Sequence, residues 1–452
     1  YSTFRLGKSL YNNEIGRLSA LIVASAFSYI LANNDVRMDA ILTACVAFAT
    51  WQGVEFIQCR KILNAIGLAL GLALGFCTKG HIAVFTPAIG LFFYILYKRD
   101  RKLFLNWKWL LVIILFALFI SPVVYCYYLQ YNLHPEKIVR GKDHIDGIKF
   151  ILLGQSVERF QGESFGGSAK NDYFFFFHSF LWAFAPWSIL AYISFIIRLK
   201  YFFKRDNEWL SVTTFIAIAL LLTFSGFKLP HYLNVIFPAT SVMTATWIVN
   251  SSLNQKLIYR IQIAVCLLIL ILTGVINAWA FPVKNYLLIC VVVLLLAIVF
   301  YFLKTPRLIK AQKALGLSVS AMAVSLFLLN TNFYPQLLKY QGGNELAKKV
   351  KGNVDPADIY FWKNSYSSSF NFYTATERKQ FDDSVVFKGK KTVWLLFDEH
   401  YEDEIKKAGY KIGLTYSVVD FEITRLNLKF INPATRKNEL ARLVLGEISG
   451  KE

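Results

Sequence analysis

The sequence predicts a polytopic α-helical membrane protein that carries a soluble α/β domain at its C-terminal end. Three observations predict this class. The 452 residues are 56% hydrophobic and 17% charged, whereas soluble domains have about a quarter of their residues charged. About eleven apolar stretches have the length of a transmembrane helix. After residue 332 the composition becomes that of a soluble domain.

The predicted membrane spans share runs of Leu, Ile, Val, Phe and Ala with few charges. They are residues 18–33, 39–57, 62–78, 81–97, 109–128, 173–198, 208–226, 231–249, 260–281, 285–303 and 314–332. We therefore expect residues 1–332 to form a multi-span membrane domain. The first residue is Tyr1, and "YSTFRLGKSLY" is typical of the end of a span that enters a basic loop. An N-terminal span and a first outer loop are thus expected before it.

The loops between these spans alternate in charge, and the net charge of the chain is +20. By the positive-inside rule, the basic set is cytoplasmic. It comprises the loops at residues 5–17, 60–61, 97–108, 198–205, 256–260 and 304–313. The other set is expected outside, and comprises residues 33–39, 78–81, 129–172, 226–232, 281–285 and the C-terminal tail. Because this pattern explains the basic residues and no reader motif accompanies them, nucleic acid is not an expected partner.

Residues 333–452 are expected to form an extracytoplasmic soluble α/β domain. "NELAKKVKG" and "EHYEDEIKKAG" are typical of helices, the second ending at Gly409. "ADIYFW" and "TVWLLF" predict short strands, and residues 410–430 are strand-rich. None of the six cysteines lies in this domain or in a C-x-x-C pair, so neither a disulfide framework nor a zinc site is predicted.

Acidic and basic side chains gather in the outer loops. In "NNDVRMDAIL", Asp35 and Asp39 lie four residues apart, at the membrane edge. Asp39 can be a base or a metal or acceptor ligand. The structural alternative is that Asp35 pairs with Arg37 and Asp39 caps the next helix. In "CTKGH", Lys79 either contacts a phosphate or extends its ammonium to water from the membrane edge.

Two further outer stretches combine cations with aromatic residues. "FSGFKLPHYLNVIFP" clusters Lys228, His231 and Tyr232 around a proline, which suits an anionic head group, although an ordinary polar turn stays open. The long loop contains "SVERF", where Arg159 can bind a phosphate bidentately beside Glu158. Its alternative is a surface ion pair. The chain has no P-loop, no G-x-S-x-G and no HExxH motif.

Four motifs together carry a resemblance to a known family: "VRMDAIL", "GLALGFCTKGHIAVFTP", "SVERFQ…YFFFFHSFLWAFAPW" and "FSGFKLPHYLNVIFP". In this order they resemble the bacterial membrane glycosyltransferases that include lipid A aminoarabinose transferase and, more distantly, the protein O-mannosyltransferases. The resemblance covers most of residues 1–250. It implies the glycosyltransferase-C fold and transfer of a sugar from a polyprenyl phosphate, typically undecaprenyl phosphate, on the outer side of the membrane.

The resemblance also implies roles for single residues. Asp39 corresponds to an acidic residue close to the family's active site, and is expected to be catalytic. Four residues are expected to bind the donor phosphate: Arg159, Lys228, Tyr232 and Lys79. Apart from the resemblance, their positions in the outer loops make Asp35, Glu158 and His231 candidates for accessory roles. Many relatives carry a histidine where this chain has Ser156, so a divalent metal stays an open question and no other cofactor is expected.

The function expected is therefore an integral glycosyltransferase of the bacterial inner membrane with its site on the periplasmic side. The acceptor is an envelope lipid such as lipid A, another glycolipid, a glycan or a protein. The alternatives are a transporter or flippase of a lipid-linked sugar, which needs polar residues along a mid-membrane path, and a binding module on an inert anchor. The late span "LLICVVVLLLAIVF" is almost wholly apolar, which disfavours the transporter.

Overall fold

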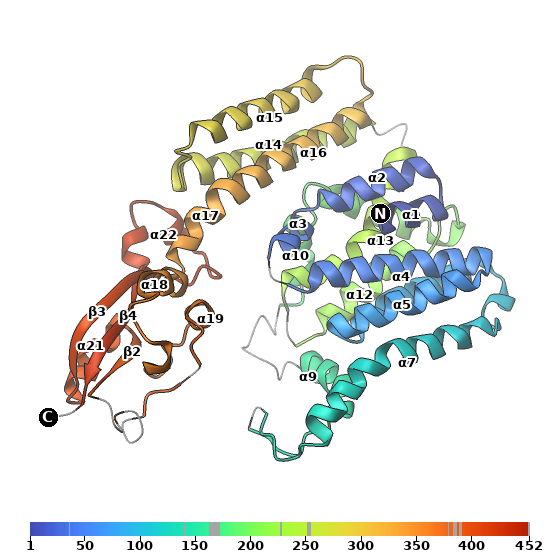
Figure 1. The fold of residues 1–452 in the computed structure, drawn as a ribbon. Helices are drawn as coiled ribbons and strands as arrows, with labels where there is room; N and C mark the ends of the chain where they lie inside the picture. The colour runs from blue at the N-terminus through green and yellow to red at the C-terminus, as the bar shows by residue number, and fades with distance from the viewer. Residues whose placement is uncertain are drawn as a thin grey trace. The chain divides into compact units, whose positions relative to one another are not determined.

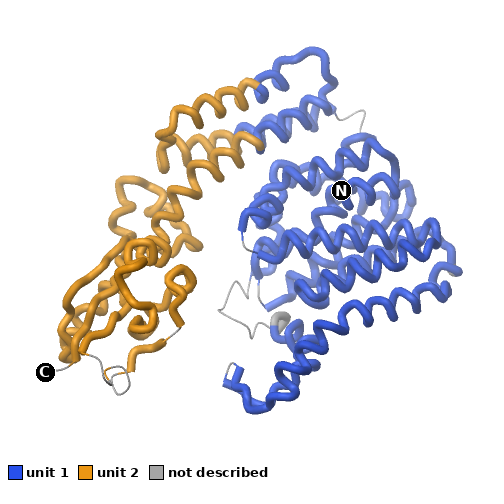
Figure 2. Tube along the Cα trace, in the orientation of Figure 1, with its two compact units in different colours: residues 1–267, 298–322 blue, residues 268–297, 323–452 orange. Residues whose placement is uncertain are grey.

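The computed structural model describes most of the chain and groups its contacts into two units (Figure 2). The described residues are 1–35, 37–139, 141–161, 172–226, 228–250, 255–377, 379–382, 387 and 391–450, with side chains left out at 101 and 159–161. Unit 1 contains residues 1–267 and 298–322, and unit 2 contains residues 268–297 and 323–452.

The named secondary-structure elements among the described residues up to 328 are helices (Figure 1). They are α1 (Ser2–Leu10), α2 (Asn13–Ala24), α3 (Phe27–Asn34), α4 (Asp39–Cys59), α5 (Ile62–Lys79), α6 (Ile82–Lys98), α7 (Lys108–Tyr127), α8 (Gly147–Lys149), α9 (Gln155–Gln161), α10 (Phe175–Ala183), α11 (Ser188–Lys200), α12 (Leu210–Thr223), α13 (Phe237–Asn250), α14 (Gln255–Gly274), α15 (Tyr286–Lys304) and α16 (Lys310–Leu328). The 3-10 helix η5 (Pro230–Ile236) leads into α13.

The predicted number of eleven membrane spans is too high when the described helices are tested by their length and hydropathy. Among the described residues, seven helices are long and apolar enough to cross a membrane, or eight if the bent pair α2 and α3 is one span. The predicted span 18–33 is this pair, bent by 58°. The span 173–198 is divided into α10 and α11 at Phe184–Trp187, where Pro186 disfavours helical backbone at the residue before it. An apolar run alone does not reveal such a break.

Small residues allow α4 and α5 to pack closely as an antiparallel pair. Gly67, Gly71 and Gly75 recur every four residues on one face of α5, in the small-xxx-small pattern of membrane helix pairs. A Cβ atom added at Gly67 would lie 2.7 Å from Oε1 of Gln52, and one at Gly71 would lie 3.0 Å from the backbone nitrogen of Ala49. This close pairing brings the first residue of α4 beside the last residue of α5.

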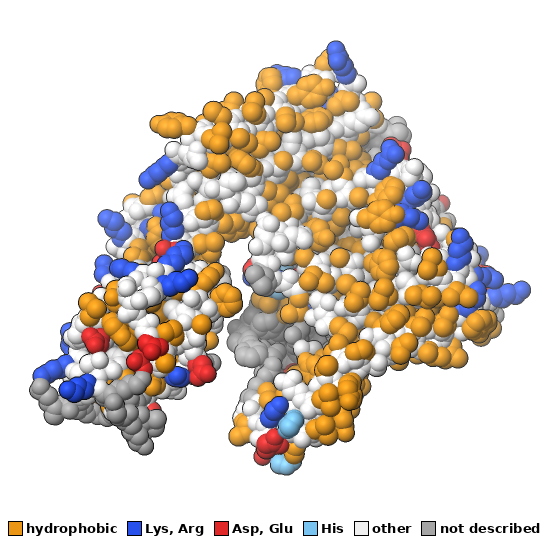
Figure 3. Space-filling model, in the orientation of Figure 1, with side chains coloured by type: hydrophobic (Ala, Val, Ile, Leu, Met, Phe, Trp, Pro, Cys, Tyr) orange, Lys and Arg blue, Asp and Glu red, His pale blue; other side chains and the backbone are white. Residues whose placement is uncertain are grey.

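The outer surface of unit 1 separates apolar from basic side chains. Hydrophobic side chains cover much of the face of unit 1 in Figure 3, and Lys and Arg gather at the end where α4 ends and α7 begins. Along α7 only Val112 and Ile120 are buried among the described residues, and Leu110, Ile113, Ile114 and Leu118 are exposed. Such a surface is stable in lipid rather than in water.

The C-terminal part of unit 2 is a small α/β domain around a four-stranded sheet (Figure 1). The strands are β1 (Ile359–Phe361), β2 (Thr392–Asp398), β3 (Lys411–Asp420) and β4 (Ala441–Ser449) in the order β1-β2-β4-β3. β1 is parallel to β2, and the other pairs are antiparallel. The remaining helices are α17 (Tyr334–Leu337), α18 (Gly342–Val350), α19 (Ser368–Thr374), α21 (Glu402–Lys407) and α22 (Leu428–Ile431).

Both faces of this sheet are covered. Val393, Leu395 and Phe397 alternate with Leu396 along β2, so they point to opposite faces. The first three belong to the core with Ile405 of α21, while Leu396 belongs to the core with the apolar residues of α18 and α19. Burial on both faces explains the continuous apolar run "TVWLLF".

Most predicted elements of this domain are confirmed. The two helices and the strands "ADIYFW" and "TVWLLF" are present as α18, α21, β1 and β2, and the strand-rich stretch begins with β3. The extension of strand to residue 430 is wrong. Asn427 accepts a hydrogen bond from the backbone N–H of Phe430 at 2.8 Å and begins α22. The central strand β4 was not predicted.

Arg436 ties this domain to the turn after α14, within unit 2. Its Nη2 donates to the carbonyl oxygen of Ala280 at 2.7 Å and of Ile431 at 3.0 Å, and its Nε donates to that of Phe430 at 2.8 Å. Its guanidinium also lies 4.1 Å from the ring centroid of Phe281. One side chain therefore joins a loop between predicted spans to the soluble domain.

Replacing Arg436 with methionine is expected to destabilise this junction by about 1.5–3 kcal/mol, the contribution of a hydrogen bond to a charged group, because buried carbonyl oxygens lose their donor. The measurement is the rate at which a protease cuts the domain from the membrane part of the full-length protein. Arg425→Met is the matched control, since Arg425 is exposed and pairs only at the surface with Glu422. Equal cutting of both variants would contradict the role of Arg436.

Candidate functional site

Polar contacts between loops of unit 1 fall into two groups that match the two loop sets of the sequence. Within the basic set, Arg60 pairs with Asp100 and Arg205 donates to the Tyr97 carbonyl oxygen. The contacts within the other set join Asp39 to Lys79, His81 to Ser156, Arg37 to His231, and Lys228 to Asp172. The residues singled out in the outer loops therefore lie on one side of unit 1.

Asp39 and Lys79 form the centre of this site. Asp39 is the first residue of α4 and Lys79 the last residue of α5, and these termini favour an anion and a cation respectively. Lys79 Nζ donates to Asp39 Oδ1 at 2.5 Å. The side chains are 11% and 4% exposed, so solvent screens this pair little. The alternative that Asp39 caps the helix is wrong, because Met38 is the N-cap residue of α4 and no side chain caps this helix.

Gly80 makes the turn from α5 to α6 possible. Its φ is +71°, which a residue with a Cβ atom rarely adopts. A Cβ atom there would also lie 3.1 Å from the Ser156 hydroxyl. The turn places His81, whose Nδ1 lies 2.8 Å from the same hydroxyl, next to Lys79.

His231 and Tyr232 reach the same pair from η5. His231 Nε2 lies 3.6 Å from Asp39 Oδ2, and Lys79 Nζ lies 4.2 Å from the centroid of the Tyr232 ring. Arg37 Nη1 lies 2.8 Å from His231 Nδ1 and is itself paired with Asp35. Pro230 begins η5, because its fixed φ suits the first position of a helix.

A cavity of about 250 Å³ opens at this cluster. Its polar lining comes from helix ends: Asp39, Lys79, His81, Ser156, Ser225 and Tyr232. Its apolar lining comes from α4, α6, α12 and η5, and apart from Ile82 these residues lie about one turn from the polar ones: Leu42, Ile82, Phe85, Leu221, Leu222 and Val235. The cavity is therefore polar toward the helix ends and apolar toward the membrane interior.

Lys228 lies on the same side but in a different environment. It is 1% exposed, and its Nζ donates to the backbone carbonyl oxygen of Asp172 at 2.8 Å. The same ammonium lies 5.3 Å from the Tyr173 ring centroid. The Asp172 carboxylate contacts His178 at 3.0 Å, and this hydrogen bond lowers the pKa of Asp172. Lys228 is not among the described residues that line the cavity.

The remaining predicted residues are placed less centrally. Asp35 is half-exposed and paired with Arg37, as its structural alternative expected. Glu158 lies in α9 and is partly buried, while the side chain of Arg159 lies outside the described part of the chain. Among described residues, no three His, Cys, Asp or Glu side chains gather in a metal-binding arrangement.

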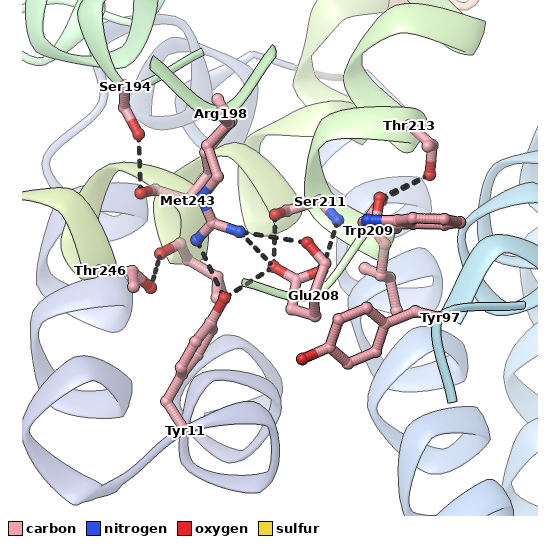
Figure 4. Close-up of polar contacts among 12 residues, drawn as sticks. Tyr11, Tyr97, Ser194, Arg198, Glu208, Trp209, Ser211, Thr213, Met243 and Thr246 are labelled. Carbon is pink, nitrogen blue, oxygen red and sulfur yellow. Dashed lines mark hydrogen bonds and ion pairs between the residues drawn. The ribbon is translucent and has the colours of Figure 1, made fainter. Parts of the chain in front are cut away.

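A second buried cluster lies among the loops of the basic set. Figure 4 shows Arg198 of α11 and Glu208 pointing toward each other, with the Tyr11 hydroxyl close to both. Arg198 Nη1 lies 3.2 Å from Glu208 Oε1, and Arg198 Nη2 donates to the Tyr11 hydroxyl at 2.9 Å. Ser211 donates to Glu208 from both its backbone nitrogen, at 2.9 Å, and its hydroxyl, at 2.6 Å. Sequence reasoning missed this cluster because basic residues in cytoplasmic loops are expected in any case.

Comparison with known proteins agrees with this fold. A family model described as dolichyl-phosphate-mannose-protein mannosyltransferase matches residues 1–126. An uncharacterized protein of Aquifex aeolicus is 21% identical over 339 residues, covering 75% of this chain and 61% of that protein. The undecaprenyl phosphate-alpha-4-amino-4-deoxy-L-arabinose arabinosyl transferase of Wigglesworthia glossinidia brevipalpis is 22% identical over 259 residues, covering 56% of this chain and 43% of that enzyme. The chain spans less than two thirds of the length of either relative.

Two solved structures have the same fold over nearly the whole chain. ArnT from Cupriavidus metallidurans bound to undecaprenyl phosphate matches with a TM-score of 0.70 and 13% identity, covering 98% of this chain and 81% of that one. Its apo state matches with a TM-score of 0.69 and 14% identity, covering 98% and 80%. The chain therefore has the glycosyltransferase-C fold that its motifs led us to expect, and parts of its sequence are similar to a protein mannosyltransferase family model and to an aminoarabinose transferase.

Proposed function

We propose that this protein is a membrane glycosyltransferase that takes a sugar from a polyprenyl phosphate carrier. The observation that carries the proposal is the two-part cavity of about 250 Å³ with Lys79 at its polar end. A polyprenyl phosphate has the same two parts, a charged head and an apolar tail. The known relatives support this choice, since one is named as an undecaprenyl phosphate-dependent arabinosyl transferase and the ArnT structure holds undecaprenyl phosphate.

The reaction is a displacement at the anomeric carbon with inversion. The acceptor oxygen or nitrogen forms the new bond to this carbon, and the bond to the phosphate oxygen breaks. Its electron pair stays on the phosphate, and the acceptor proton passes to a carboxylate. Lys79 stabilises the charge that develops on the leaving phosphate. Asp39 orients the acceptor and accepts its proton, and the arginine and lysine of the loops, Arg159 and Lys228, add positive potential at the same side.

The proposed location is the bacterial inner membrane, with the cavity and the C-terminal domain on the periplasmic side. Nucleotide sugars are absent there, so a donor must arrive on a lipid. The acceptor belongs to the cell envelope. It is lipid A, another glycolipid, a glycan or a protein. The polar groups between α14 and α16 give no support to the transporter alternative, because Gln262 donates to Ser318. Just beyond the C-terminal ends of these helices, Asn332 likewise donates to Asn277.

The test is binding of undecaprenyl phosphate to the full-length protein in lipid nanodiscs, compared with undecaprenol, which lacks the phosphate. We expect saturable binding of the phosphate form and weaker binding of the alcohol, because the alcohol offers nothing to Lys79. Equal binding of both lipids, or of neither, would overturn the proposal.

A further inference from the structure

The Asp39–Lys79 pair raises a question of charge balance for the proposed site. The single positive charge of Lys79 is already opposed by a carboxylate at 2.5 Å. A phosphate that enters the cavity adds further negative charge close to Asp39, in a setting where the side chains of the pair are nearly buried. Because buried like charges repel strongly and an uncompensated buried charge is costly, one lysine cannot neutralise both anions.

His231 places a polar N–H group close to Asp39, just beyond hydrogen-bond distance. An arginine only donates hydrogen bonds, so Arg37 at 2.8 Å requires His231 Nδ1 to be the acceptor. The ring proton of the neutral imidazole then lies on Nε2, which faces Asp39 Oδ2 at 3.6 Å. The N-terminus of α4 stabilises the same carboxylate. Asp39 therefore keeps favourable partners on Oδ2 and at its backbone when Lys79 leaves Oδ1.

Tyr232 supports a movement of the lysine. Its ring centroid lies 4.2 Å from Lys79 Nζ, and the face of an aromatic ring attracts a cation. The lysine side chain has a flexible four-carbon stem. Its ammonium can thus turn from Asp39 toward the cavity along a surface that keeps stabilising its charge.

We propose that Lys79 exchanges between two anions: it pairs with Asp39 in the unloaded protein and with the carrier phosphate once the donor binds. This inference rests on the proposed function. Donor binding then uncovers Asp39 Oδ1, which becomes a hydrogen-bond acceptor for the acceptor nucleophile only when a donor is present. The site is thereby ordered, with the donor first and activation of the acceptor second.

Loss of a site residue usually weakens donor binding, whereas the proposed exchange predicts that loss of the Asp39 charge strengthens it. Asp39→Asn removes the internal competitor for Lys79, so undecaprenyl phosphate should bind about tenfold more tightly or better, in line with the coupling of close charge pairs. The same variant should lose sugar transfer. The probe is undecaprenyl phosphate with the full-length protein in nanodiscs, and Asp143→Asn is the control because Asp143 is exposed in the long loop.

Removing a negative charge also strengthens phosphate binding through space, without any exchange. The two effects separate in a Lys79→Met background. If the exchange occurs, Asp39→Asn should increase the affinity for undecaprenyl phosphate much more in the protein with Lys79 than in the Lys79→Met protein. An equal gain in both backgrounds would overturn the exchange while leaving the proposed function intact. Failure of the wild-type protein to bind undecaprenyl phosphate would instead overturn the proposed function.

His231 gives an independent test of the same exchange. His231→Leu removes the donor that supports Asp39 after Lys79 leaves, so undecaprenyl phosphate binding should weaken several-fold. His231→Gln keeps an N–H donor and should restore binding. In the Asp39→Asn background, which has no carboxylate to support, both His231 variants should bind alike. A loss that persists there would assign His231 a role other than support of Asp39.

Discussion

Replacing Arg198 with methionine is expected to lower the free energy of unfolding of the membrane part by about 3–5 kcal/mol, the cost of breaking one side of a buried ion pair. The variant leaves the Glu208 carboxylate almost fully buried, with neutral hydroxyl and amide donors but no cation. The Tyr11 hydroxyl loses its donor as well. Burial raises the pKa of Tyr11, so its phenol stays neutral and offers Glu208 a hydrogen bond but no positive charge.

The measurement is unfolding of the full-length protein by denaturing detergent in mixed micelles. Arg60→Met is the matched control: Arg60 and Asp100 lie 3.0 Å apart in the same loop set, but their side chains are 52% and 40% exposed. That variant should cost about 0–1 kcal/mol. Glu208→Leu added to Arg198→Met should recover part of the loss, because it removes the orphaned charge. If the Arg198 and Arg60 variants lost equal free energy of unfolding, burial of the Arg198–Glu208 pair would not contribute to stability.

The fold was predictable from the sequence to the extent that composition and periodicity determine it. Long apolar runs identified the membrane helices α4, α5, α7, α14, α15 and α16 and the continuous helix of η5 and α13. They did not reveal where a run is interrupted, as between α10 and α11, because the residues at the break are as apolar as their neighbours. β4 was missed for a related reason: its partners β2 and β3 come earlier in the chain, and pairing between distant segments has no local signal.

The candidate site was predictable from residue types at helix ends, but its connections were not. "VRMDAIL" and "CTKGH" mark Asp39 and Lys79, and the lengths of α4 and α5 bring the two together. Arg37 received no role beyond pairing with Asp35, although it is the residue that fixes the tautomer of His231. A contact between residues far apart in sequence, 37 and 231, depends on the packing of η5 against α4.

Replacing Lys79 with methionine is expected to reduce sugar transfer by about 10²–10³-fold, the usual loss when one donor to a developing anion is removed. Methionine matches the length and apolar stem of lysine, so the cavity walls stay intact while the ammonium is lost. Membranes of a strain that lacks the gene supply both the lipid-linked donor and the acceptor, and the quantity measured is undecaprenyl phosphate released. This readout does not require the sugar to be known in advance.

Two variants separate the charge of Lys79 from its place in the fold. Lys149→Met removes a lysine exposed on the same side, in α8, and should leave transfer unchanged. Lys79→Arg keeps the charge but changes its geometry from a compact ammonium to a planar fork, so it should retain more activity than Lys79→Met. Since the methionine variant also frees the buried Asp39 carboxylate from its cation, its stability must be measured beside its activity. Transfer at the wild-type rate by a folded Lys79→Met protein would remove Lys79 from the reaction and, with it, the reason for placing the donor phosphate in this cavity.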